Sequence, residues 1–238
     1  MKISIAIPTW ECHGRGSEFL NDLLRTIEKQ SFDEFEVCIS DHSKDDLLIN
    51  VYCKFKDRLD IKYSKNIYDF GNGPANTNRA ISMCSSDIIK VIFQDDFFFD
   101  DESLGKIYTE LSISDRVWLL NGCNHTRDDG FSFYNEMYPR WNDKIINGVN
   151  TISSPSVLSF RREVFDRVKF DSKLTMMMDC EFYYHTRSIF GDPVYCDDVL
   201  TTNRVHSNQI SQIHYNSESH YQNMKDEISY CREKHQRK

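Results

Sequence analysis

The sequence predicts an α/β protein with a mostly parallel sheet, and two observations lead to that prediction. Through the first half of the 238 residues, short apolar strand-like segments alternate with segments whose apolar residues recur at helical spacing. Polar residues directly follow three of the strand-like segments, which is typical of the ligand-binding edge of a parallel sheet. The chain has no internal repeat and no clear linker, so we expect one main domain.

Each element of the first half has its own sequence evidence. Ser17 is the expected N-cap of the first helix, in which Phe19 and Leu23 lie at helical spacing. Pro74 is expected near the start of a later helix, because proline suits the first helical turn. The predicted strands are residues 3–7, 35–39, 61–63 and 88–93, and the predicted helices are residues 17–30, 47–51 and 76–83.

The second half is less regular, and residues 123–141 carry no conformational prediction. Its final segment is a polar helix whose charges are mixed. The predicted strands or extended segments are residues 116–121, 157–160 and 194–204, and the predicted helices are residues 161–168, 179–189 and 217–236.

Composition and charge narrow the class of protein. Hydrophobic residues make up 39% and charged residues 28%, as in a globular protein, and the net charge of -8 without a basic stripe argues against a nucleic-acid partner. Eight cysteines without a C-x-x-C pair indicate free thiols in a reducing compartment. No segment has the length of a membrane span or the pattern of a signal peptide. We therefore expect a cytoplasmic protein, with peripheral membrane contact left open.

Three polar loops are expected to meet at one edge of the sheet, because the carboxyl ends of parallel strands lie together. They are residues 8–11, 40–43 and 94–96. The third loop follows a strongly apolar strand and delivers two adjacent carboxylates, Asp95 and Asp96. Carboxylates together with substrate phosphates are the ligands that Mg²⁺ and Mn²⁺ prefer. The alternative is that the two acids begin a turn and cap the next helix.

The first two loops offer groups that suit a nucleotide base. Trp10 is placed to stack on a nucleobase, unless its ring packs against the core. Asp41 is placed to accept a hydrogen bond from a base N–H, or else it forms an Asx turn with Ser43. In the stretch NGPANTNR, the helix N-terminus and Arg79 would face a phosphate or the metal-site acids, unless this helix is simply a capped surface helix.

Carboxylate and imidazole groups recur near the end of the chain. Asp179 and Glu181 are two residues apart, so on a helix they point to different sides, and the one that faces a cleft would serve as a general base. In the segment RVHSNQIS, His206 would ligate the metal and Arg204 would pair with phosphate.

The order of these segments resembles the family-2 glycosyltransferases. The resemblance rests on SIAIPTWE, VCISDHSKDD, NGPANTNRAISMCSSDIIKVIFQDDF, SSPSVLSFRREVF, FDSKLTMMMDCEFYYHTR and VLTTNRVHSNQIS, and it runs to about residue 209. It implies the A-type glycosyltransferase fold, a single Rossmann-like nucleotide-binding domain. It also implies a catalytic domain over residues 1–213 and a C-terminal helical extension over residues 214–238.

The resemblance implies a role for each matched position. Where the family has Asp-x-Asp, this chain has Phe93, Gln94 and Asp95, so Asp95 is the expected direct metal ligand and Asp96 a supporting one. His206 matches a position near the metal or diphosphate, and Asp179 matches the catalytic base, with Glu181 a second candidate. The positions implied to bind the donor nucleotide are Pro8, Thr9, Trp10, Glu11, Asp41, Asn78, Arg79, Gln94 and Asp95.

The function implied is an inverting transfer of a sugar from a nucleoside-diphosphate sugar to an acceptor hydroxyl, such as that of a growing glycan, assisted by Mn²⁺ or Mg²⁺. Two alternatives stay open. A sugar-nucleotide pyrophosphorylase would want a glycine-rich basic loop after the first strand, for which Gly14, Arg15 and Gly16 offer a slight match. A catalytically silent module that binds a sugar nucleotide or glycan would account for the missing first aspartate. The oligomeric state is left open.

Overall fold

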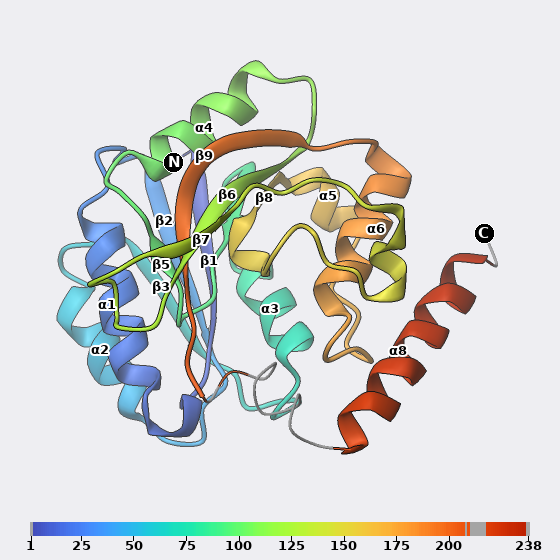
Figure 1. The fold of residues 1–238 in the computed structure, drawn as a ribbon. Helices are drawn as coiled ribbons and strands as arrows, with labels where there is room; N and C mark the ends of the chain where they lie inside the picture. The colour runs from blue at the N-terminus through green and yellow to red at the C-terminus, as the bar shows by residue number, and fades with distance from the viewer. Residues whose placement is uncertain (1, 208, 210–217, 237–238) are drawn as a thin grey trace.

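A nine-stranded mixed sheet runs through the protein (Figure 1). The structure is a computed structural model, and it describes residues 2–207, 209 and 218–236. The strand order along the sheet is β3-β2-β1-β4-β8-β6-β9-β5, and β7 pairs with β6. The strands are β1 (Ile3–Thr9), β2 (Phe35–Asp41), β3 (Ile61–Lys65), β4 (Ile88–Val91), β5 (Phe97–Phe98), β6 (Trp118–Thr126), β7 (Tyr134–Met137), β8 (Leu158–Arg161) and β9 (Val194–Arg204).

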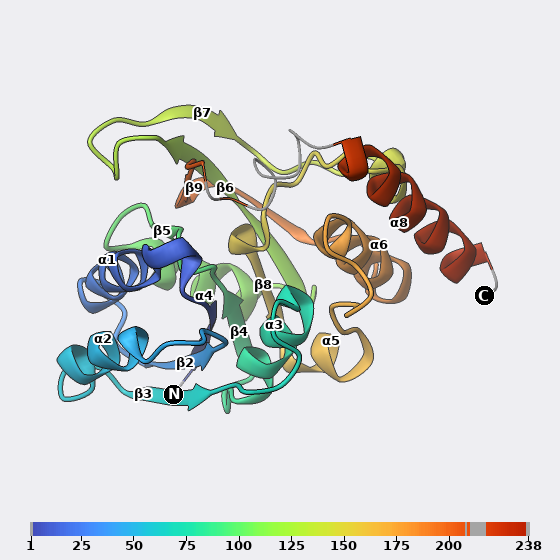
Figure 2. The same cartoon turned by 90° about the horizontal axis from the view of Figure 1, so that it is seen from below.

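Helices cover both faces of the sheet, with α1, α2 and α4 on one face and α3, α5, α6 and α8 on the other (Figure 2). Among the described residues, three short 3₁₀ helices lie in the connections: Cys12–Gly14 (η1), Asp143–Asn147 (η2) and Pro155–Val157 (η3). The α-helices are α1 (Gly16–Glu28), α2 (Leu47–Phe55), α3 (Gly73–Ser82), α4 (Ser103–Ile113), α5 (Arg162–Arg167), α6 (Met178–Phe190) and α8 (Glu218–Gln236).

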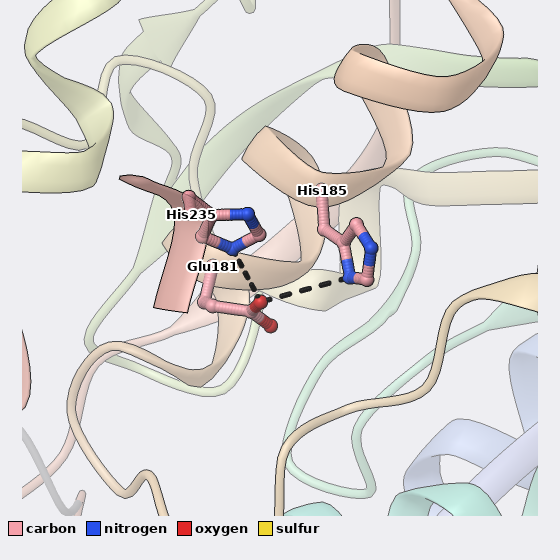
Figure 3. A group of neighbouring side chains, drawn as sticks. All are labelled: Glu181, His185 and His235. Carbon is pink, nitrogen blue, oxygen red and sulfur yellow. Dashed lines mark hydrogen bonds and ion pairs between the residues drawn. The ribbon is translucent and has the colours of Figure 1, made fainter. Parts of the chain in front are cut away.

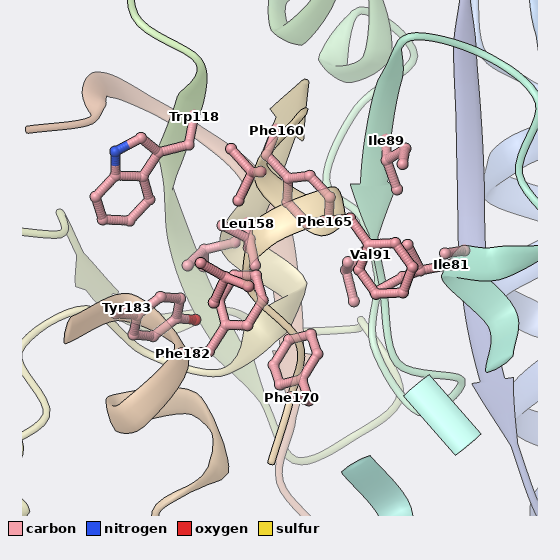
Figure 4. Close-up of a cluster of buried hydrophobic side chains, with 14 of the residues drawn as sticks. Ile81, Ile89, Val91, Trp118, Leu158, Phe160, Phe165, Phe170, Phe182 and Tyr183 are labelled. Carbon is pink, nitrogen blue, oxygen red and sulfur yellow. The ribbon is translucent and has the colours of Figure 1, made fainter. Parts of the chain in front are cut away.

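Alternation along the strands builds a separate core on each face. Ile88 and Ile92 pack toward α1, α2 and α4, whereas Ile89 and Val91 pack toward α3, α5 and α6. Figure 4 shows the second of these cores, where the rings of Phe170 and Phe182 stack with centroids 4.2 Å apart. Burial on both faces explains why the inner strands read as nearly continuous apolar segments.

The predicted fold class is confirmed, and parallel pairing is concentrated in the first half. β1 pairs in parallel with β2 and β4, and β2 with β3, as strand–helix alternation predicts. In the second half, β8 lies antiparallel between β4 and β6, while β6 and β9 are parallel. The segment without a prediction, residues 123–141, contains the end of β6 and the antiparallel strand β7.

Two local expectations are wrong. Ser17 is not the N-cap of α1, because the helix begins at Gly16 directly after the 3₁₀ turn, and Arg15 occupies the cap position without a side-chain cap bond. The strand predicted over residues 88–93 ends at Val91, because the Phe93 N–H donates to the Ser156 hydroxyl (2.9 Å) instead of to a neighbouring strand. None of the described helices is long and apolar enough to cross a membrane.

A buried carboxylate joins β2 to β1 and to the loop before β4. Glu36 is 1% exposed and accepts hydrogen bonds from the hydroxyls of Ser4 (2.5 Å) and Ser85 (2.8 Å), while Lys62 forms an ion pair with it (2.6 Å). Burial alone would raise the pKa of Glu36, but the bonds from Lys62, Ser4 and Ser85 lower that pKa to about 2. The ionised form therefore contributes to the stability of the folded sheet.

We expect Glu36→Gln to lower the free energy of unfolding by about 1–3 kcal/mol at pH 7, because the variant loses a hydrogen-bonded charge pair. Since folding depresses the pKa of Glu36 from 4.5 to about 2, its contribution is complete above pH 4.5 and is lost as the pH falls toward 2. The difference in the free energy of unfolding between wild type and variant should therefore become smaller as the pH falls from 7 to 3.5, as measured by urea unfolding.

The matched control is Glu34→Gln, which removes an exposed carboxylate paired with Lys2 (2.6 Å). This pair is largely solvated, so the control should change stability much less than Glu36→Gln does. A Glu36→Gln effect that equals the control, or that grows as the pH falls, would contradict the assignment.

Candidate active site

The loops that follow β1, β2 and β4 meet at the edge where these strands end, here named the carboxyl edge. The Trp10 N–H donates to Gln94 Oε1 (2.6 Å), and Gln94 Nε2 donates to the Trp10 carbonyl (2.8 Å). The Lys44 N–H donates to Glu11 Oε2 (3.3 Å), and the His42 N–H donates to the Thr9 carbonyl (2.8 Å). The expected convergence of the three loops is therefore observed.

Backbone geometry makes the first loop turn sharply. Cys12 and His13 have positive φ values of 46° and 52°, and a Cβ at Gly16 would lie 2.2 Å from the Trp10 carbonyl oxygen. Only glycine fits there, so α1 begins directly beneath the loop. Trp10 itself is partly exposed, and its ring contacts that of His13 edge-on at 5.1 Å. Its indole is thus presented at the carboxyl edge instead of being buried in the core.

Asn76 on α3 holds the ends of β1 and β2 together, a role that the sequence analysis missed. Its Nδ2 donates to the carbonyls of Thr9 and Ser40 (both 3.1 Å), and its Oδ1 accepts from the Ser40 hydroxyl (2.7 Å) and from Asn66 (3.2 Å). The side chain is 4% exposed, so these bonds satisfy polar groups that water does not reach.

Asp41 is fully buried and surrounded by donors. Its Oδ1 accepts from the Ser43 N–H (2.8 Å) and hydroxyl, so the alternative Asx turn is present. Its Oδ2 accepts from the Tyr63 hydroxyl and from Lys65 Nζ (3.2 Å). A contact between Asp41 and a bound base would therefore require one of these bonds to be exchanged.

Asp95 and His206 are brought together from distant parts of the sequence. Asp95 Oδ2 lies 3.1 Å from His206 Nε2, and the side chains are 21% and 7% exposed. The His206 ring packs against Phe19 with centroids 4.8 Å apart, and its Nδ1 is buried without a hydrogen-bond partner among the described residues. A carboxylate oxygen and an imidazole nitrogen at this separation suit two ligands of one divalent cation.

Asp96 points into the protein and not toward the carboxyl edge. Its Oδ1 accepts from the Arg204 N–H (3.0 Å), and its Oδ2 lies 3.4 Å from the Ser154 hydroxyl. Burial and the neighbouring charge of Asp95 raise its pKa. Neither acid caps the next helix, because α4 begins at Ser103 and Asp100 accepts the N–H of Glu102 there (3.0 Å). The helix-capping alternative is therefore wrong.

Arg204 is occupied by protein groups. Its side chain is 2% exposed, Nε donates to the Asp95 carbonyl (3.0 Å), and the guanidinium pairs with Asp129 and with Asp22 (3.2 Å). These contacts hold the Asp95 backbone in place. Because Nε and both terminal nitrogens of Arg204 are already bonded to protein groups, the predicted pairing of Arg204 with a phosphate is not supported. Arg15 is likewise paired with Glu18 (2.7 Å), so the loop around it does not present a free basic group.

Asp179 lies at the start of α6 and is connected to the carboxyl edge through residues 150–154. Asn150 Nδ2 donates to Asp179 Oδ2 (2.7 Å), and the Tyr183 hydroxyl donates to the Ser154 carbonyl (3.1 Å). Ser153 between them has a φ of 111°, a strained value for a residue with a side chain. Burial raises the pKa of Asp179 to about 6.

Glu181 points elsewhere, as its spacing from Asp179 predicts. Its carboxylate accepts from His235 Nε2 (2.8 Å) and pairs with Lys234 (2.9 Å), both on α8. It is fully buried under that helix, whereas Asp179 is only partly buried and is bonded to Asn150.

Asn78 and Arg79 line a hollow of about 600 Å³ between α3 and α5. Asn78 exchanges two hydrogen bonds with the Phe170 backbone (2.7 and 3.0 Å), whereas the Arg79 side chain is exposed. Asn72 caps α3 by accepting the Ala75 N–H (2.9 Å), and Pro74 lies in its first turn as predicted. Arg79 is thus available to a ligand, while Asn78 has a structural partner.

The chain is similar to known proteins in sequence and in fold. Residues 4–169 match the family described as Glycosyl transferase family 2. A poly(ribitol-phosphate) beta-N-acetylglucosaminyltransferase, TarS of Staphylococcus aureus (strain Mu50 / ATCC 700699), is 25% identical over 99 residues, which are 41% of this chain and 17% of that protein.

Two groups of solved structures share the fold. S. aureus TarS 1–349 in complex with UDP has a TM-score of 0.70 at 19% identity, over 95% of this chain and 65% of that one. The mannosyltransferase PcManGT from Pyrobaculum calidifontis, in complex with GDP-Man and Mn²⁺, has a TM-score of 0.67 at 13% identity, over 90% of this chain and 59% of that one. The chain therefore spans less than two thirds of the length of these proteins.

The paired bonds between Gln94 and Trp10 can be tested by an isosteric change. Gln94→Glu keeps the acceptor for the Trp10 N–H but places a carboxylate oxygen against the Trp10 carbonyl. We expect the free energy of unfolding to fall by about 1–3 kcal/mol, because a buried hydrogen bond becomes a repulsion. Urea unfolding measures the change. Gln236→Glu, which adds the same charge at the exposed end of α8, is the control, and equal effects of the two variants would refute the role of Gln94.

Proposed function

The chain belongs to glycosyl transferase family 2, and from that premise we propose that it moves a sugar from a nucleoside-diphosphate sugar to an acceptor hydroxyl with inversion at the anomeric carbon. The observation that carries this proposal is the placement of Trp10, Asp95 and His206 at one edge of the sheet, with Asp179 connected to it through residues 150–154. Structural neighbours solved in complex with UDP-GlcNAc and with GDP-Man support a donor of this class.

The donor nucleotide is proposed to lie along the carboxyl edge. Its base would stack on Trp10 beside the loop of Asp41, with Pro8, Thr9 and Glu11 forming the floor of the site. Arg79, exposed at the neighbouring hollow, supplies a cation for the diphosphate. Gln94 acts by positioning Trp10, through two hydrogen bonds to its backbone.

A divalent cation fits the groups present. Asp95 and His206 supply an oxygen and a nitrogen ligand 3.1 Å apart, which leaves the remaining positions to diphosphate oxygens and water. When bound, Mn²⁺ or Mg²⁺ neutralises the charge that develops on the leaving diphosphate. We assign Asp96 a supporting role, because its oxygens are already engaged by Arg204 and Ser154.

Asp179 is proposed as the general base. It would accept the proton of the acceptor hydroxyl as that oxygen bonds to the anomeric carbon and the bond to the diphosphate oxygen breaks. Asn150 holds one of its oxygens (2.7 Å), which orients the carboxylate. A pKa of about 6 leaves Asp179 mostly ionised at neutral pH yet more basic than an ordinary aspartate, which suits proton transfer.

We propose residues 1–213 as the catalytic domain and residues 214–238 as a helical extension. The boundary between them lies outside the described residues. The extension contributes α8, whose Glu227 accepts three backbone N–H groups at the start of α6, from Thr175 (2.9 Å), Met176 (2.9 Å) and Met177 (2.8 Å). Through these bonds the extension supports the helix that carries Asp179.

The two alternatives are less well supported. A pyrophosphorylase would need a basic glycine-rich loop for a triphosphate, but Arg15 is paired with Glu18 and Asp129. A silent binding module would not need a base, whereas Asp179 is oriented and has a raised pKa next to the site. Release of pyrophosphate from a nucleoside triphosphate would favour the first, and donor binding without transfer or hydrolysis would favour the second.

Asp179→Asn is expected to lower the rate of sugar transfer by about 10²–10⁴-fold while donor affinity stays within a few-fold of wild type. The reason is that the amide keeps the shape of the carboxylate but cannot accept the proton. The rate of donor turnover is measured by the release of nucleoside diphosphate, and donor affinity is measured by calorimetry. Asp166→Asn, exposed on α5, is the matched control. Near-normal turnover in Asp179→Asn would reject the general-base role.

Removal of divalent cations by a chelator is expected to reduce transfer by at least about tenfold, with recovery on adding Mn²⁺ or Mg²⁺. In a thermal-shift screen, one nucleoside diphosphate should raise the Tm more with Mn²⁺ than without it, which also identifies the base of the donor. Asp95→Asn and His206→Ala should each lose this extra shift, whereas His125→Ala should retain it. Full activity in excess chelator would contradict the metal assignment.

A further inference from the structure

A second group of potential metal ligands lies between α6 and α8. Glu181 and His185 are four residues apart on α6 and share one face of that helix, and His235 faces them from α8 (Figure 3). One ligand atom from each of the three side chains lies within 4.8 Å of the other two. His235 Nε2 is 2.8 Å and His185 Nδ1 is 3.7 Å from Glu181 Oε1.

The Glu181 carboxylate is incompletely satisfied. Its side chain is fully buried, and its Oε2 has no hydrogen-bond partner among the described residues. A buried carboxylate oxygen without a partner is costly, so a ligand that bonds to it would stabilise the folded state. The two imidazoles lie beside the other oxygen, Oε1, so the carboxylate and both rings together suit a transition metal as the ligand of this cluster.

We propose that Glu181, His185 and His235 bind Zn²⁺ and thereby fasten the C-terminal helix to α6. Two histidines and one glutamate are a ligand set that zinc takes in proteins, with a water molecule in the fourth position. Two imidazole nitrogens with a single carboxylate favour Zn²⁺ over Mg²⁺ and Ca²⁺. This site therefore differs in chemistry from the site at Asp95, where one imidazole and one carboxylate would share the cation with diphosphate oxygens.

Lys234 is the group that competes with a metal here. Its Nζ lies 2.9 Å from Glu181 Oε1, but it also lies 2.6 Å from Asp171 Oδ2. Lys234 therefore has a second carboxylate to pair with when the metal takes Glu181. Without metal, Lys234 and His235 provide the compensating donors, and with metal the two histidines become its ligands.

The consequence is a link between metal binding and the helix of Asp179. Glu181 follows Asp179 by half a turn, and α8 already supplies Glu227 to the backbone at the start of α6. A cation that joins α8 to α6 would hold Glu227 in place and with it the end of the helix that presents Asp179. This role does not depend on the sugar transfer proposed above.

The test is Zn²⁺ binding by the full chain after chelator treatment and removal of the chelator. We expect one equivalent of Zn²⁺ to bind and to raise the Tm, and one equivalent of Co²⁺ to give the visible absorption of a tetrahedral site. His185→Ala and His235→Ala should each weaken Zn²⁺ binding by more than the 10–100-fold typical of losing an outer-shell partner. Circular dichroism establishes that each variant is folded.

Three control variants make the result specific. His125→Ala removes a histidine on β6 and should leave the Zn²⁺-dependent shift unchanged. Asp95→Asn should also retain the Zn²⁺-dependent shift, which separates this site from the proposed donor site. The zinc proposal can therefore fail without any bearing on the proposed sugar transfer. Lys234→Gln should lower the Tm of the metal-free protein but keep the response to Zn²⁺. A wild-type shift no larger than that of His185→Ala and His235→Ala would overturn the proposal.

Discussion

The parallel pairing of β1 with β2 and β4 is the constraint on which the site depends. In the register of these strands, Thr9 lies beside Asp41 and Ala6 lies beside Val91. The polypeptide therefore leaves all three strands at the same edge of the sheet. Their loops contain little regular structure beyond the 3₁₀ turn at Cys12–Gly14, and side chains hold them in place. Gln94 and Asn76 each bond to the backbone of the first loop or of its strand, so a short length of irregular chain becomes a defined surface.

Beneath that surface lies a set of buried charges that hydrophobic packing alone would not tolerate. Lys90 is fully buried, donates to Asn121 (3.0 Å) and to the Ser156 carbonyl (2.5 Å), and has a pKa lowered by burial. Asp96 and Arg204 complete the set. These groups connect β4, β6 and β9 just below Asp95, and their desolvation is offset by hydrogen bonds to nearly every polar atom. The desolvation of these groups is unfavourable, but their bonds hold the carboxylate of Asp95 at a fixed position.

Much of this architecture follows from local sequence. Strand–helix alternation identified the parallel half, residues 194–204 correspond to β9, and the helix predicted over residues 179–189 corresponds to α6. The pairing of Asp95 with His206 was expected only as part of a shared metal site. What local sequence could not reveal depends on contacts between distant segments. β8 enters the sheet antiparallel between β4 and β6, and no periodicity encodes which strands become its neighbours.

The polar residues that sequence analysis missed share the same cause. In the sequence, Asn76 looks like any polar residue on a helix, and its role depends on the ends of two strands that lie next to it only in the folded protein. Asn150 is an exposed loop residue, and its role depends on Asp179, which α6 brings beside it. The Glu181 cluster needs α8 to fold back on α6. Where an expectation rested on a single side chain, as for the Ser17 cap, neighbouring backbone groups decided the outcome.

The carboxylate of Glu227 has a consequence for how the protein is made. α6 has no side-chain cap of its own at Met177, and the acceptor for the preceding amides follows Thr175 by 52 residues. During synthesis, the amino end of this helix is therefore made before its acceptor, and the N–H groups of residues 175–177 are bonded by Glu227 only after α8 has been translated. The geometry around Asp179 is thus completed only when α8 has folded against α6.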